Sequence, residues 1–160
     1  MNETLDDRTT AYVLETRRPF EDLRQVAAQL AGLLVLAASG ARSAAPDHPM
    51  LDAARELFEH AADEIRCARP SRRAREHHGH LVMAVSAIDV ALGAASVYLR
   101  GNRHDRLDAM LVPLKAGYAQ LQQAADRLPG FVLVAFDQCC CVTGQVGRVG
   151  QAGHAGQVGG

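Results

Sequence analysis

The stretch from Ser71 to Gly101 constrains the fold of this chain more than any other part of its sequence. Its apolar residues recur at three- and four-residue steps, which is the period of an α-helix, and they fall on two faces. The main face carries Leu81, Val85, Ile88, Leu92, Ala95 and Leu99, and the second carries Met83, Ala87, Val90, Ala94 and Val97. A helix with two apolar faces is covered by more than one neighbour, so we expect it at the centre of a bundle or at a subunit interface.

Three further helices are predicted by the same periodicity. The first begins at Pro19 and ends at Gly40, the second begins near Leu51 and ends at Pro70, and the last lies between Asn102 and Leu128. Pro19 is suited to a first helical turn, whereas Pro113 falls inside the last helix and is expected to bend it. Short connections between four helices favour an all-α fold, an antiparallel up-down four-helix bundle.

The end of the chain is expected to contain no further helix. Residues 131–136 have strand propensity, but Ala11 to Glu15 is the only candidate partner strand, so we expect the segment to pack in extended form against the bundle. Glycine then occurs at every third position of a polar tail. Such a tail has little to bury and much backbone entropy to lose, so we expect a helical domain over 1–142 and disorder over 143–160.

Charge and cysteine usage narrow the functional classes. A formal net charge of −1 argues against a protein that coats nucleic acid or an anionic membrane. Three of the four cysteines are adjacent, which does not fit a secreted disulfide framework, and the acidic N-terminus has no signal-peptide pattern. Arginine and alanine are abundant and Lys115 is the only lysine, a composition typical of GC-rich bacterial coding. We therefore expect a cytoplasmic, bacterial protein.

A strip of small and polar residues runs along the predicted central helix. It consists of Ser86, Asp89, Gly93 and Ser96. A mid-span aspartate is costly in hydrocarbon, so we expect no membrane span here. Small residues at helical spacing allow another helix to approach closely, and we interpret the strip as either the bundle centre or the interface of a homodimer.

Metal or thiol chemistry would have to come from cysteine and histidine. Cys139 and Cys141 share one side of an extended chain, and His77 and His80 can share one face of a helix, so these four are the candidate metal ligands. Their spacing matches no zinc motif. The alternative interpretation is that the cysteines are small buried hydrophobes and that the histidines have no ligand.

Three arginines fall in the first turn of the predicted central helix. Arg72, Arg73 and Arg75, with the free backbone amides of that turn, are a candidate anion-binding site. The alternative is a solvated loop whose charge is neutralised by nearby acidic residues.

No phosphate-binding glycine loop, nucleophile elbow or zinc-protease pair is present in the sequence. We therefore expect a non-catalytic adaptor or regulatory protein that acts by protein–protein association as a homodimer. The alternative is a metal- or thiol-dependent protein, an enzyme included, that uses the cysteines and histidines named above.

Overall fold

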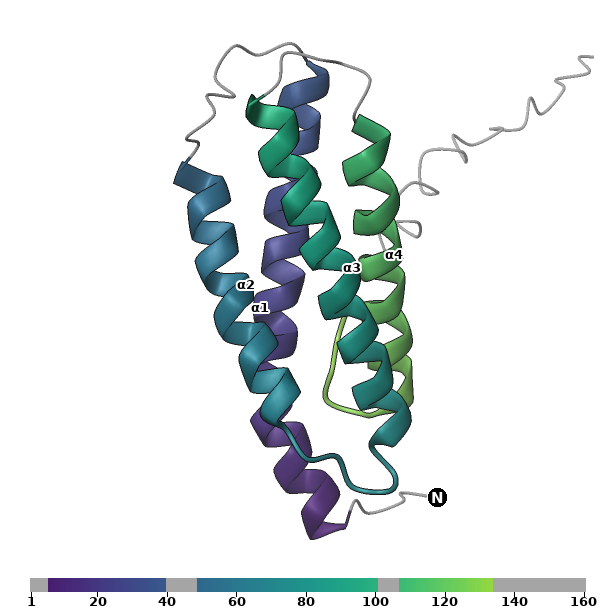
Figure 1. Ribbon diagram of the computed structural model, residues 1–160. Coiled ribbons are helices and arrows are strands. Elements are labelled where there is room, and N and C mark those ends of the chain that lie inside the picture. The colour runs from purple at the N-terminus through teal and green to yellow at the C-terminus, as the bar shows by residue number, and fades with distance from the viewer. Residues whose placement is uncertain (1–5, 40–48, 101–106, 134–160) are drawn as a thin grey trace, which may run out of the picture.

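The computed structural model describes residues 6–39, 49–100 and 107–133. These residues form four α-helices and no strand: α1 (Asp7–Ala38), α2 (Pro49–Cys67), α3 (Arg75–Arg100) and α4 (Leu107–Arg127). Successive helices run in opposite directions along one another (Figure 1). The all-α up-down bundle predicted from the apolar periodicity is therefore confirmed.

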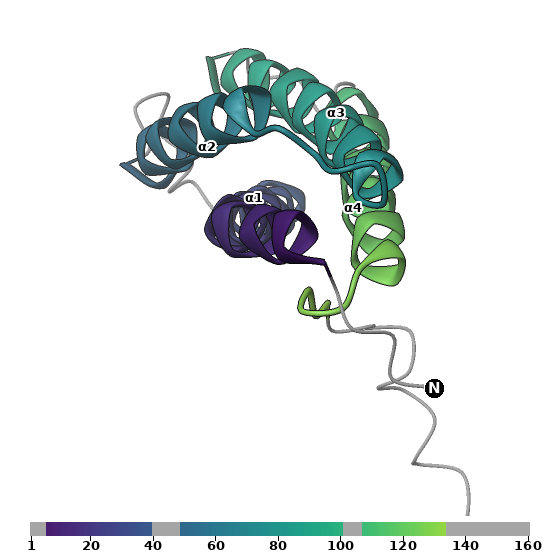
Figure 2. The ribbon, with the colours of Figure 1, turned by 90° about the horizontal axis from the view of Figure 1, so that it is seen from below.

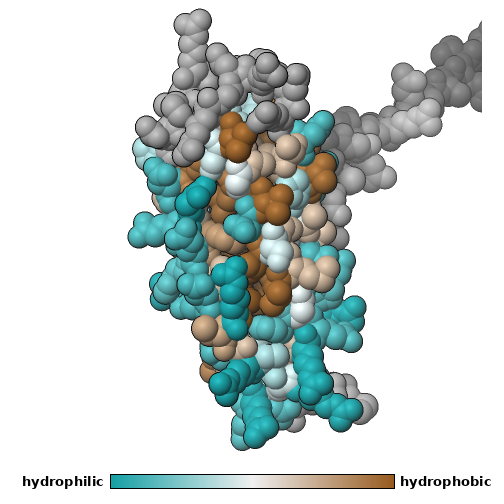
Figure 3. Space-filling view, viewed as in Figure 1, coloured by the Kyte–Doolittle hydropathy of each residue, from teal (hydrophilic) through white to brown (hydrophobic). Residues whose placement is uncertain are grey.

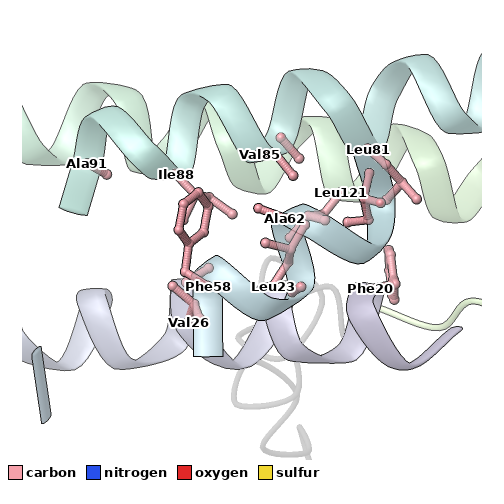
Figure 4. Close-up of a cluster of buried hydrophobic side chains, with 14 of the residues drawn as sticks. Phe20, Leu23, Val26, Phe58, Ala62, Leu81, Val85, Ile88, Ala91 and Leu121 are labelled. Atoms are coloured by element: carbon pink, nitrogen blue, oxygen red, sulfur yellow. The ribbon is translucent and has the colours of Figure 1, made fainter. Parts of the chain in front are cut away.

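The four helices are arranged as an arc around one member. Seen along the bundle, α2, α3 and α4 form the arc and α1 lies on its concave side (Figure 2). Buried side chains from all four helices fill the space between them, among them Phe20, Phe58, Ile88 and Leu121 (Figure 4). Because α1 covers the inner side of the arc, the outer side of α3 faces away from the other helices.

Helix α1 begins earlier than predicted. It starts at Asp7 and Pro19 lies inside it, so the assignment of Pro19 to a first turn was wrong. The start is fixed by Asp6, whose Oδ1 accepts a hydrogen bond from the Thr9 amide at 2.7 Å, as an N-cap does; this bond lowers the pKa of Asp6. Residues 11–15, the one candidate partner strand, lie in this additional part of α1 and are therefore helical. Tyr12 is buried there.

The chain turns sharply after α4 and returns to the bundle. Gly130 has a positive φ of 104°, a conformation that favours glycine. Phe131 is then buried against Phe20, with 5.0 Å between ring centroids, and Leu133 packs partly buried on the same core. The predicted non-helical packing is confirmed for 131–133. Cys139, Cys141 and the glycine-containing tail lie outside the described residues.

Candidate functional site

The outward side of α3 is apolar over most of its length. We call it the outer α3 face and define it by Gly79, Val82, Met83, Ser86, Asp89, Val90, Gly93 and Val97. The larger members remain substantially exposed: Val82 by 39%, Met83 by 55%, Val90 by 60% and Val97 by 48%. Brown and pale residues accordingly run along the middle of this side of the molecule (Figure 3). Of the two alternatives for this second apolar face, cover by a neighbour within the bundle does not apply to Met83, Val90 and Val97.

Few charges interrupt this face. Asp89 is the one Asp, Glu, Lys or Arg among residues 77–98. The hydroxyl of Ser86 donates to the Val82 carbonyl at 3.1 Å, so it is satisfied within its own helix. A Cβ placed on Gly79 or Gly93 would meet no atom within 4 Å, so the face is open at both positions. The outer α3 face therefore offers an approaching surface apolar side chains and accessible backbone.

The predicted interface strip lies on or beside this face and not in the bundle centre. Ser86, Asp89 and Gly93 are exposed, and Ser96 is partly buried at the edge toward α2. Ser96 Oγ accepts a hydrogen bond from Arg55 Nη2 at 2.6 Å and donates to the Leu92 carbonyl. The bundle-centre interpretation is thus excluded for the exposed members, whereas the interface interpretation stays a prediction.

Helix α3 is also long and apolar enough to cross a membrane. Among the described residues, Arg75–Tyr98 is the one such stretch, and 39% of its most apolar part is buried within the chain. Core helices of soluble proteins have the same length and composition, so this property alone does not identify a membrane span.

His77 belongs to a buried cluster rather than to an open site. Its side chain is fully buried at the start of α3, where its Nδ1 and Tyr12 Oη share a hydrogen bond of 3.0 Å. Its ring lies against Phe131, with 4.3 Å between centroids. Burial lowers the pKa of His77 to about 4 and raises the pKa of Tyr12 above its usual value. Both groups are therefore neutral at pH 7, which fits a role in packing α1, α3 and residue 131 together.

His80 has a different neighbour from His77. Its Nδ1 donates to Gln120 Oε1 on α4 at 2.8 Å, whereas His77 is directed toward Tyr12 on α1. No group of three His, Cys, Asp or Glu side chains that could hold a metal ion occurs within residues 6–39, 49–100 and 107–133. The two imidazoles therefore bond to different helices, and Cys139 and Cys141 lie outside the described residues, so metal binding by these four residues stays a prediction.

The predicted anion site lies at the turn before α3. Arg72, Arg73 and Arg75 are all exposed. The Ala74 amide already donates to the Ser71 carbonyl at 3.1 Å, so one of the amides expected to face an anion is used within the turn. Arg73 also lies near enough to Asp6 to help lower the pKa of that carboxyl. These contacts favour a charged, solvated corner, and anion binding there stays a prediction.

One close helix approach was not anticipated from the sequence. A Cβ on Gly117 of α4 would lie 2.8 Å from Ile88 Cγ1 of α3, so this glycine sets the contact between the two helices. The approach that small residues permit within the chain therefore occurs at Gly117, while Gly93 remains open to solvent. The apolar stripe of α4 contained no signal that would have distinguished this glycine.

Comparison with protein-family models, with curated proteins and with solved structures finds no match to this chain.

Proposed function

We propose that this chain is a non-catalytic, cytoplasmic association protein that dimerises through the outer α3 face. The observation that carries the proposal is the exposure of Val82, Met83, Val90 and Val97 on a face with Asp89 as its one charge. The outward side of a helix in a monomeric bundle is normally charged or polar, and contiguous apolar surface on a soluble protein marks a binding site.

A second copy of the chain is a suitable occupant because the face offers almost no charge for an oppositely charged partner to recognise. The four apolar side chains expose on average half of their surface. Burying that half is worth about 0.7 to 1.5 kcal/mol for each side chain, or about 6 to 12 kcal/mol for the eight in a dimer. Lost translational and rotational freedom offsets at least about 4 kcal/mol of this gain, so from the upper part of this range we expect a dimer with a dissociation constant in the micromolar range.

The proposal is tested by comparing the same substitution on two faces. Val90→Glu places a carboxylate in the outer α3 face, and Val35→Glu places one on α1, where the valine is 68% exposed. Neither change disturbs a buried side chain, so the bundle should fold in both. Sedimentation at about 10 to 500 μM, in reductant because Cys67 is exposed, should show a dimer for wild type and Val35→Glu.

For Val90→Glu we expect dimerisation to weaken by at least about tenfold, because both copies would bring a desolvated carboxylate to the interface. A wild-type chain that stays monomeric throughout the range would remove the proposal. Equal weakening by Val35→Glu would show that another surface is responsible.

A further inference from the structure

We infer that the two copies pair their α3 helices in antiparallel direction, about a two-fold axis that passes beside Ser86. This inference rests on the proposed function and specifies its partner and geometry. In a two-fold dimer each copy presents the same patch, so the face must be complementary to itself when it is turned end for end. The positions and charges on the outer α3 face meet that requirement around Ser86.

The small residues of the face are symmetric about Ser86. Gly79 and Gly93 each lie seven positions from it, and seven residues are close to two helical turns, so all three lie along one line of the helix. In an antiparallel pair centred on Ser86, Gly79 of one copy therefore faces Gly93 of the other. Apart from its chain neighbours and its own helix backbone, neither glycine has an atom within 4 Å of the position that a Cβ would take, so both sites are free to receive a helix.

The apolar residues come into register in the same arrangement. Met83 lies three positions before Ser86 and Val90 lies four positions after it, so Met83 of one copy lies within one residue's rise of Val90 of the other and contacts it. Both are more than half exposed in the single chain. The hydroxyl of Ser86 at the centre is bonded to the Val82 carbonyl and needs no partner across the axis. Close approach at the small residues thus brings the larger side chains into contact.

The charges favour the antiparallel direction over the parallel one. Parallel helices would place the two Asp89 carboxylates at one level, whereas the antiparallel pair separates them along the axis by about 9 Å, comparable with the screening length of about 8 Å at physiological salt. Parallel pairing would also bring together both arginine corners, with Arg72, Arg73 and Arg75 from each copy. In the antiparallel pair the two Arg75 positions are about 33 Å apart along the axis.

The end-to-end contacts also differ. In the antiparallel pair each arginine corner lies at the level of the C-terminal end of the partner's α3. The backbone carbonyls at that end carry partial negative charge, which favours nearby cations.

A mixture of two single variants tests the direction. Met83→Lys in one chain and Val90→Glu in the other create an ammonium and a carboxylate that meet only if position 83 of one copy faces position 90 of its partner. A carbodiimide, which joins an amine directly to a carboxylate, should then give a covalent dimer from the mixture. Lys115 is the only native lysine, so the background is low and is measured with Val90→Glu alone.

The control replaces Met83→Lys with Val35→Lys, which puts the amine on α1. We expect a cross-link between positions 83 and 90, identified by peptide mass spectrometry, and none between 35 and 90. If the wild-type chain dimerises through this face but the mixture gives no 83–90 link, the antiparallel inference is overturned and the proposed function survives. If the wild-type chain is monomeric, both fail.

Discussion

Adding one methyl group to Gly117 should destabilise the bundle, although alanine is the better helix former. A Cβ at Gly117 would lie 2.8 Å from Ile88 Cγ1 and 3.5 Å from both the Ala84 carbonyl oxygen and Ala87 Cβ. Ile88 is fully buried, and its Cγ1 is an inner atom of the side chain and not its flexible end. The contact can therefore be relieved only by moving the closely packed core. We expect this overpacking to cost about 1 to 3 kcal/mol.

Helix propensity works in the opposite direction. Replacing a helical glycine by alanine gains about 1 kcal/mol, so Gly117→Ala should lower the free energy of unfolding by about 0 to 2 kcal/mol net. Gly32→Ala in α1 is the matched control, because a Cβ there would meet nothing within 4 Å. It should raise the free energy of unfolding by up to about 1 kcal/mol.

Urea unfolding followed by circular dichroism measures both changes. If the slope of the free energy of unfolding against urea concentration is unchanged, the compactness of the folded and unfolded states is preserved. The two variants should differ by about 1 to 3 kcal/mol, with Gly117→Ala the less stable. In an Ile88→Ala background the added methyl has room, so Gly117→Ala should lose its penalty. A Gly117→Ala protein as stable as Gly32→Ala would refute the close approach of α3 and α4 at this position.

Two further predictions concern the buried cluster around His77. The pKa of His77 is lowered to about 4 from the ordinary 6.5, so the unfolded chain binds the additional proton between these values, and the free energy of unfolding should fall as pH drops from about 6.5 toward 4. The full loss is about 3 kcal/mol. His77→Gln should reduce this loss of stability in acid, whereas His60→Gln, at an exposed site, should leave it unchanged. If the free energy of unfolding fell equally with pH in both variants, the acid sensitivity would not come from His77. Phe131→Ala should lower the free energy of unfolding by about 3 to 5 kcal/mol because the ring packs on Phe20 and His77. Val132→Ala, at a residue 69% exposed, should stay within about 0.5 kcal/mol of wild type in the same denaturation experiment. Similar effects of both changes would count against the packing of this segment.

Periodicity was sufficient to predict the bundle because the apolar stripes of α2, α3 and α4 are local patterns. It misplaced the start of α1 because proline is common in a first helical turn, and the N-cap at Asp6 was overlooked. The contact between Tyr12 and His77 joins residues 65 positions apart, so no local pattern could reveal it.

The same limitation applies to the surface of α3. Hydrophobic spacing shows that Val90 and Val97 lie on an apolar face, but it does not show which faces of α3 the neighbouring helices cover. Only the arrangement of the other three helices shows that this face is uncovered in the single chain. The metal hypothesis depends equally on residues far apart in the sequence, and Cys139 and Cys141 lie outside the described part of the chain.

Sedimentation equilibrium of the wild-type chain measures its self-association without any substitution or label. We expect a reversible equilibrium in which the weight-average mass rises from the 17.1 kDa of one chain toward twice that value as the concentration increases to about 500 μM. Val90→Glu should shift this equilibrium toward the monomer. A mass that stays at 17.1 kDa across the whole range would contradict association through the outer α3 face.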